Sequence, residues 1–206
     1  MSLDLIGLTL GISFASGLNV YATVATLGLL SRFHVIALPL HLAPLAHPVV
    51  IGLALFLYVV EFFADKIPFL DSVWDMVHTF IRPPAAALLA FAAIAGVPEP
   101  WRIGAALLAG GIALTSHGTK AATRAAVNTS PEPVSNWLLS VGEDALAIAV
   151  AWISAVFPVV AIVVVVALLI LSVWILIRLY HLLYRVFTGA VGVGSAWRSP
   201  GDLGRT

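Results

Sequence analysis

Long apolar runs separated by short polar stretches are the main pattern along the chain. Leu5–Ser31 carries no charged residue and ends at Arg32. A helix that crosses a bilayer needs about 20 consecutive, mostly apolar residues, so this run predicts a first membrane span. A loop rich in proline and histidine follows up to His47, and Pro48–Val60 is the uncharged body of a second span that continues into Glu61.

Two further spans are predicted in the middle of the chain. Pro83–Pro98 forms a short third span, closed by a Val-Pro-Glu-Pro turn. A fourth begins at Ile103 and keeps a helical pattern through His117 and Lys120. These two spans are less uniformly apolar than the first, because the fourth carries charged residues in its second half.

The last apolar block is too long for one crossing. Ala145–Ile177 contains 33 uncharged residues, which as a single helix would measure about 50 Å, whereas the hydrocarbon core is about 30 Å thick. Pro158 lies near the middle of the block, and proline kinks or ends a helix. We therefore predict two spans, Asn136–Phe157 and Val159–Leu179, and six spans in all.

Composition supports a membrane protein. Of the 206 residues 61% are hydrophobic and 10% are charged, whereas about a quarter of the residues of a soluble domain are charged. The sequence predicts an all-α integral membrane protein, a bundle of about six transmembrane helices with one or two short broken or re-entrant helices. We expect one domain over residues 1–188 and a flexible tail over residues 189–206, which is rich in glycine and serine.

Charge and cysteine content exclude several function classes. The net charge is zero, so nothing indicates nucleic acid as a partner. The absence of cysteine excludes disulfides, thiolate chemistry and cysteine-bound metals. The beginning of the chain lacks the basic stretch of a signal peptide, so we expect its first apolar segment to remain as a helix.

Basic residues predict the orientation. Four arginines follow the last apolar block: Arg178, Arg185, Arg198 and Arg205. Loops on the cytoplasmic side are enriched in lysine and arginine, so the C-terminal end is expected in the cytoplasm. With six spans, the N-terminus is expected on the same side.

The first charged segment, Glu61–Arg82, lies between the second and third spans. At 100° per residue, its polar side chains fall within about 60° of each other on a helix; they are Asp71, Asp75, His78 and Arg82. Pro68 precedes and Pro83 follows this stretch. The pattern indicates a short amphipathic helix that lies on the membrane surface or enters the bundle as a re-entrant element.

The second charged segment, His117–Asp144, contains two polar stripes. The first consists of His117, Lys120, Arg124 and Asn128, and the second of Asn136, Ser140 and Glu143. Asp144 is adjacent but points elsewhere. If the fifth span begins near Asn136, Glu143 and Asp144 lie about two turns inside it.

Charges in these positions need partners. A charged side chain in a span costs a few kcal/mol and usually faces the bundle interior, paired with another group. One stripe is mainly acidic and the other mainly basic, so we predict that the two segments meet in one site. The alternative is a set of salt bridges that only hold broken helices together. Polar residues of the first span are either helix-packing contacts or part of a lining; they are Ser13, Ser16, Asn19 and Thr23.

Both charged segments resemble those of a known family. Ala-Asp-Lys-Ile-Pro-x-x-Asp-Ser-x-Trp-Asp-x-x-His-Thr-x-x-Arg-Pro, from Ala64 to Pro83, is similar to a hallmark of an uncharacterised bacterial membrane family, domain of unknown function 4126. So is Thr119-Lys-Ala-x-x-Arg-x-x-x-Asn-x-Ser-Pro-Glu-Pro-x-Ser-Asn136, followed by Glu143-Asp144. The resemblance implies a small multi-pass protein of the bacterial inner membrane and carries no established activity.

The leading hypothesis is a transporter or channel-like protein that handles an ion or an anionic lipid head group. Its site would be formed by Asp71, Asp75, His78, Arg82, His117, Lys120, Arg124, Asn128, Glu143 and Asp144. Carboxylates within a bundle suit cations or protons, whereas the three basic residues suit a phosphate. A divalent cation at Asp71, Asp75 and His78 is a further candidate, and no other cofactor is expected.

Two other function classes stay open. A membrane-embedded enzyme acting on lipids would need acid–base groups such as Asp75 with His78, but the sequence contains no His-Glu-x-x-His motif, no Gly-x-Ser-x-Gly motif and no cysteine nucleophile. We therefore favour a protein that is not an enzyme. A structural subunit is the third alternative. The sequence leaves the substrate, the energy source and a homo-oligomeric state undetermined.

Overall fold

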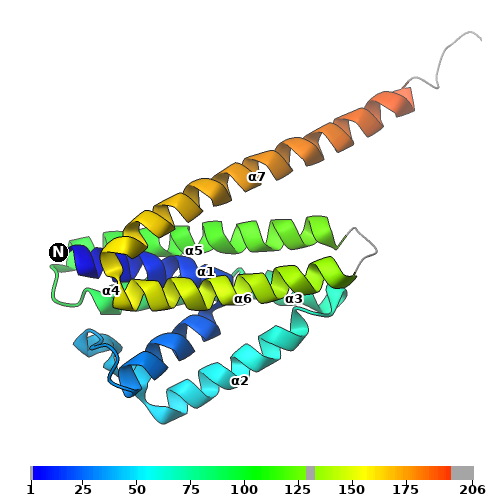
Figure 1. Ribbon diagram of the computed structural model, residues 1–206. Coiled ribbons are helices and arrows are strands. Elements are labelled where there is room, and N and C mark those ends of the chain that lie inside the picture. Colours follow the sequence, from blue (N-terminus) through cyan, green and yellow to red (C-terminus); the bar gives the residue numbers. More distant parts are fainter. Residues whose placement is uncertain (1, 129–132, 196–206) are drawn as a thin grey trace, which may run out of the picture.

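The protein is entirely helical over the residues that its computed structural model describes, 2–128 and 133–195 (Figure 1). The helices, in chain order, are α1 (Leu3–Arg32), the 3-10 helix η1 (Leu40–Ala46), α2 (Pro48–Ala64), α3 (Pro68–His78), α4 (Arg82–Ala93), α5 (Glu99–Val127), α6 (Pro133–Val156) and α7 (Pro158–Ser195). This order confirms the predicted helical bundle.

Several helices are long and apolar enough to cross a membrane. Three pass by length and hydropathy alone, within α1, α6 and α7, and two bent pairs, η1 with α2 and α3 with α4, raise the number to five. The fourth predicted span corresponds to α5, which is not among these candidates; it has 29 residues but contains Lys120 and Arg124. These charges lower its hydropathy even though both side chains are buried. The structure thus supports a membrane protein with three to five candidate spans.

Helix α1 is broken in the middle, at Asn19. The backbone of this residue is extended, with φ −156° and ψ 103°, and its side-chain Oδ1 accepts a hydrogen bond of 2.9 Å from Ala22 N. Extended backbone and a side chain that accepts from the third residue beyond define a helix N-cap. Asn19 therefore ends one helix and begins another.

The second half of α1 runs back toward the end of the bundle where the chain begins (Figure 1). Asp4, near the start of α1, lines the same surface pocket as Pro39, which follows its end. The expected helix over Leu5–Ser31 is therefore present, but it forms a helical hairpin with its tip at Asn19 rather than a straight span.

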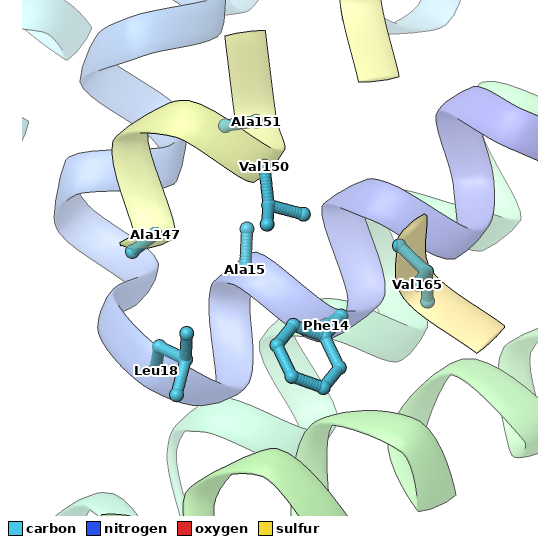
Figure 2. Packing of buried hydrophobic residues seen from close by; sticks show 7 residues of the cluster. All are labelled: Phe14, Ala15, Leu18, Ala147, Val150, Ala151 and Val165. Carbon is cyan, nitrogen blue, oxygen red and sulfur yellow. The ribbon is translucent and has the colours of Figure 1, made fainter. Parts of the chain in front are cut away.

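The first half of α1 packs against α6 and α7. Figure 2 shows Phe14, Ala15 and Leu18 facing Ala147, Val150 and Ala151 of α6, with Val165 of α7 beside them. Close approach depends on two glycines. A Cβ at Gly7 would collide with the backbone of Pro158, and one at Gly11 with the side chain of Ser154. The hairpin is thus held from outside by the last two helices.

Helix α3 is amphipathic in the opposite sense to a helix on a water-soluble protein. Asp71, Asp75 and His78 are buried. Met76 is 66% exposed and Val77 is 50% exposed. A polar face turned inward and an apolar face turned outward fit a helix surrounded by lipid. The packing thus favours a position of α3 within the bilayer over a position on the membrane surface.

Proline divides the last apolar block as predicted. α6 ends at Val156 and α7 begins at Pro158, with Phe157 between them. α7 continues to Ser195, so residues 189–195 of the expected tail are helical. The remainder of that tail, 196–206, lies outside the described residues, as do residues 129–132, which include most of the Ser-Pro-Glu-Pro sequence between the two polar stripes of the second charged segment.

The hairpin also changes where the termini lie. Gly7 lies against Pro158 at the beginning of α7, and α7 then leads away for 38 residues, or about 57 Å. The structure consequently places the N-terminus and the end of α7 at opposite ends of the bundle (Figure 1). The sequence prediction had both on one side, because it counted α1 as a crossing.

Candidate functional site: a buried charge network at the tip of the hairpin

Charged side chains from five helices meet inside the bundle, around the tip of α1. The end of α2, the helix α3, the beginning of α4, the last turns of α5 and the first half of α6 contribute to it. The ten residues predicted from sequence all lie in this region, and nine of them are buried; Asn128 at the end of α5 is partly buried. We call this group the charge network.

Arg82 connects α4 to four other helices, α1, α2, α3 and α5. Its Nη2 donates to Glu61 Oε1 on α2 at 2.6 Å. Its Nη1 donates to the carbonyl oxygen of Gly17 in α1 at 3.1 Å and to His117 Nδ1 on α5 at 2.7 Å. Asp75 Oδ1 lies 3.8 Å from the same nitrogen. The Arg82 side chain is fully buried, so every one of these contacts is shielded from solvent.

Lys120 lies on α5 one turn after His117, on the same face of the helix. Its Nζ donates to Asp65 Oδ2 at 3.0 Å and lies 3.5 Å from Glu61 Oε1. It also donates to the carbonyl oxygen of Leu18 at 3.3 Å. Arg82 and Lys120 therefore bind the carbonyls of the two residues that precede the break in α1. Carbonyls at the end of a helix lack intrahelical partners, so these two cations stabilise the hairpin tip.

Arg124 contacts three carboxylates, one turn further along α5. Its Nε and Nη2 lie 2.8 Å and 2.7 Å from Glu143 Oε2. Nη1 donates to Asp71 Oδ1 at 2.7 Å, and Nη2 to Asp65 Oδ2 at 2.9 Å. The planar guanidinium suits such multiple contacts. The predicted meeting of the two charged segments is confirmed here, since Asp65 and Asp71 belong to the first and Glu143 to the second.

The two buried histidines have defined hydrogen-bond roles. An arginine can only donate, so His117 Nδ1 accepts from Arg82, and the proton of the neutral ring is on Nε2, which lies 3.1 Å from the carbonyl of Asp75. His78 Nδ1 lies 2.8 Å from the carbonyl of Trp74 and must donate to it. Its Nε2 then accepts from the hydroxyl of Tyr21 at 3.2 Å when the ring is neutral. His117 therefore adds no positive charge to the network.

Carboxylates outnumber cations in the network. Among the described residues, three basic side chains are buried, Arg82, Lys120 and Arg124. The acidic side chains buried beside them number six: Glu61, Asp65, Asp71, Asp75, Glu143 and Asp144. An uncompensated charge in a protein interior costs several kcal/mol. Protons or bound cations are two ways in which such a surplus of carboxylates can be compensated.

Unpartnered polar atoms occur at the same place. Within the described part of the chain, one oxygen of each of four buried carboxylates lacks a hydrogen-bond partner: Glu61 Oε2, Asp65 Oδ1, Asp75 Oδ1 and Asp144 Oδ2. Buried polar atoms are nearly always satisfied. Free acceptors of this kind call for a donor or a cation, whereas the three basic side chains have most of their N–H groups engaged by carboxylates and carbonyls.

A small pocket reaches the network from outside. It has a volume of about 230 Å³ and lies between α3 and α5. Asp71, Asp75 and Arg124 line it, together with Thr79. The pocket is partly open, so it connects these residues of the network to the surroundings.

The structure does not bring the proposed divalent-cation ligands together. Asp71 pairs with Arg124 and Asn128, whereas His78 bonds to Trp74 and Tyr21. Among the described residues, no three side chains of the metal-binding types are arranged around one point. A divalent ion at Asp71, Asp75 and His78 stays an untested prediction.

Sequence reasoning left several participants out of the site. Glu61 and Asp65 belong to the first charged segment but were not among the ten predicted site residues. Asn19 was considered only as a packing or lining residue, although its amide Nδ2 donates to Asp144 Oδ1 at 2.9 Å. A Gly-Leu-Asn sequence in an apolar helix is a signal that could have indicated a break with an N-cap.

The comparison with known families agrees with the resemblance noted from the motifs. The profile of the family described as Domain of unknown function (DUF4126) matches residues 6–178, so the chain belongs to this family. No curated protein and no solved structure matches the chain.

Proposed function

We propose that the protein is a small membrane transporter that moves a monovalent cation through the charge network. The observation that carries this proposal is the excess of buried carboxylates, six against three basic side chains among the described residues. A site with this balance favours cations. An anionic lipid head group would need several free basic donors. Arg82, Lys120 and Arg124 are each engaged by carboxylates, and of their nitrogen atoms Arg82 Nε lacks a hydrogen-bond partner within the described residues.

The hairpin of α1 supports the same class of function. Interrupted helices whose ends lie inside the membrane, beside charged side chains, are typical of transporter sites. Here the break at Asn19 lies near the middle of α1, and the charge network surrounds it. Non-helical backbone at membrane depth is tolerated where it contacts protein or a wet cavity.

The proposed topology has five crossings and one re-entrant hairpin. The crossings are α2, the bent pair α3–α4, α5, α6 and α7, whereas α1 enters and returns. Lys66, Arg178 and Arg185 follow α2 or lie near the far end of α7, and Arg32 and Arg102 mark the opposite end. The positive-inside rule then puts the end of α7 in the cytoplasm, with the N-terminus on the other side. An inner-membrane location stays a prediction.

Flux measurements test the proposal. The full chain is reconstituted into liposomes, and uptake of protons, sodium and potassium is followed with ion-sensitive dyes, beside scrambling of a fluorescent anionic lipid. We expect cation flux in the wild type and at least a tenfold reduction in Asp75→Asn, because Asp75 lines the pocket and pairs only weakly with Arg82.

Asp4→Asn serves as the matched control, since Asp4 is an exposed carboxylate outside the network, and its flux should equal that of the wild type. Lipid scrambling without cation flux would refute the cation assignment and favour an anionic head group. Folded protein without any flux would indicate that the network has a structural role.

A further inference from the structure

Asp144 differs from the other carboxylates of the network. Glu61, Asp65, Asp71, Asp75 and Glu143 each lie within 4.0 Å of a lysine or arginine nitrogen, and Asp144 has no such ion pair among the described residues. It is 3% exposed. Its Oδ1 accepts a hydrogen bond from the neutral amide of Asn19, and its second oxygen, Oδ2, is unpartnered within the described residues.

The position of Asp144 makes an isolated charge expensive. It lies midway along α6, which runs from Pro133 to Val156, so about 17 Å of helix separates it from either end. A carboxylate at this depth is stable only with a proton or a counter-ion. Within the described residues no lysine or arginine nitrogen lies within 4.0 Å of its oxygens, so a proton or a bound cation is the candidate for the compensating charge.

Neutral ligands are present beside it on the same face of α6. Ser140 is one helical turn before Asp144, and Asn136 is one turn before Ser140, so the three side chains form one stripe. Ser140 is fully buried and Asn136 is 4% exposed. Ser140 Oγ and both polar atoms of the Asn136 side chain lack hydrogen-bond partners within the described residues. The stripe leads about 12 Å from the first turn of α6 to its middle.

We propose that Asp144, with Ser140 one turn away, binds a monovalent cation beside the tip of the α1 hairpin, and that Asn136 lies on the route to this site. The proposal deepens the proposed function, since it names the binding residue for the transported ion. One carboxylate with neutral oxygen ligands suits a proton or an alkali cation. A divalent ion would need several carboxylates at one point, and none of the described groups is arranged in this way.

The surroundings of Asp144 set its electrostatic balance. Asp144 interacts electrostatically with Tyr58, Glu61 and Asp65 at the side of α2. It also interacts with Lys66, which follows α2, and with Lys120 of α5. Glu143 is its neighbour in the chain. Two basic groups thus face three acidic ones, and both the lysine of α5 and the acids of α2 already pair with other groups.

Asn19 links the site to the hairpin. Its Nδ2 donates to Asp144 Oδ1, while its Oδ1 caps the second half of α1. A cation on Oδ2 leaves the first contact intact, whereas a proton on Oδ1 would turn this oxygen into a hydroxyl group and weaken it as the acceptor for Nδ2. The hydrogen bond from Asn19 therefore depends on which oxygen of Asp144 binds the proton or the cation.

Binding is tested on the purified full chain in detergent. Thermal unfolding is recorded in lithium, sodium, potassium or choline chloride at equal ionic strength, and infrared spectra are recorded to detect a protonated carboxyl group. For an alkali cation, we expect at least one salt to raise the unfolding midpoint relative to choline, with weaker apparent binding at lower pH because protons compete. For a proton, we expect a protonated-carboxyl band that disappears in Asp144→Asn.

Variants separate this site from the rest of the network. Asp144→Asn should abolish the cation effect or the band, and Ser140→Ala should weaken alkali binding about tenfold, the equivalent of one lost ligand of about 1.4 kcal/mol. Asp4→Asn is the control and should behave as the wild type. If Asp144→Asn does not fold, Ser140→Ala and Asn136→Ala carry the test.

The outcomes distinguish the two proposals. Stabilisation by calcium or magnesium alone, or the absence of both the salt effect and the band, would overturn the site. Cation flux in liposomes that persists in Asp144→Asn would leave transport in place and refute Asp144 as the binding residue. Binding at Asp144 without flux in any variant would support the site and refute transport.

Discussion

Arg124 offers the sharpest test of how the charge network stabilises the fold. Its guanidinium contacts Glu143, Asp65 and Asp71 within 3.0 Å, so Arg124→Gln leaves three buried carboxylates with less positive charge. Removing one partner of a buried ion pair typically costs about 3–5 kcal/mol. Lys120 still contacts Asp65, which moderates the loss there, whereas Asp71 keeps only Asn128.

We therefore expect Arg124→Gln to lower the free energy of unfolding by about 3–5 kcal/mol, or at least two orders of magnitude in the equilibrium constant. Arg124→Lys should fall between this variant and the wild type, because an ammonium keeps the charge but lacks the planar fork. The assay is reversible unfolding in mixed micelles by titration with a denaturing detergent, with Arg102→Gln as the control. Arg102 is only partly buried and bonds to the carbonyl of Phe91, so we expect a change of less than about 1 kcal/mol there.

The pH dependence of the same variant provides a second readout. In the folded Arg124→Gln protein the orphaned carboxylates bind protons that the unfolded chain releases near neutral pH. Stability rises with falling pH wherever the folded state holds more protons, so the deficit should shrink as the pH is lowered from neutral. A deficit below about 1 kcal/mol at neutral pH, or one that grows on acidification, would refute the account of the network given above.

Other substitutions test single elements of the structure. Gly17→Ala should destabilise the protein by about 1–3 kcal/mol, because a Cβ there would collide with Ser116 Oγ and the Ala113 carbonyl; Gly111→Ala, with nothing within 4 Å, should be neutral or stabilising by up to about 1 kcal/mol in the same unfolding assay. Asn19→Ala should cost about 1–2 kcal/mol through loss of the cap, and Asn19→Asp, which keeps the cap acceptor but faces Asp144, should cost more, so equal losses would argue against the contact with Asp144. Met76→Cys should be labelled by a lipid-soluble maleimide and not by a membrane-impermeant charged one, since Met76 is 66% exposed on the outer face of α3; rapid labelling by the charged reagent would place α3 on the membrane surface.

The helices and the meeting of the two charged segments were predictable from local pattern. The periodicity of Asp71, Asp75 and His78 on one helix and of His117, Lys120 and Arg124 on another fixes which side chains share a face, and burial of opposite charges then requires the faces to meet. The pairing itself was not predictable in detail. Arg124 reaches both Glu143 and Asp71, and only the three-dimensional packing of α3, α5 and α6 decides that.

The break in α1 escaped prediction for a different reason. By mean hydropathy, Leu3–Arg32 is a single apolar helix, because one asparagine barely changes the mean hydropathy of a span-length segment. The turn depends on an N-cap whose partner is three residues away and on cations more than sixty residues away. The side on which the N-terminus lies stays a prediction, and it depends on this break, since the topology of every later helix follows from whether the first one crosses.

Physical requirements that follow from one another explain most of the charge network, but they do not explain Asp144. A break inside the membrane exposes the carbonyls of Gly17 and Leu18, and Arg82 and Lys120 supply their donors. Two buried cations in turn require carboxylates, which Glu61 and Asp65 provide. None of these requirements involves Asp144, because Asn19 needs only a neutral acceptor and a serine or glutamine could provide it. A charge that stability does not require, at the tip of a re-entrant hairpin, is best explained by an ion that the protein binds.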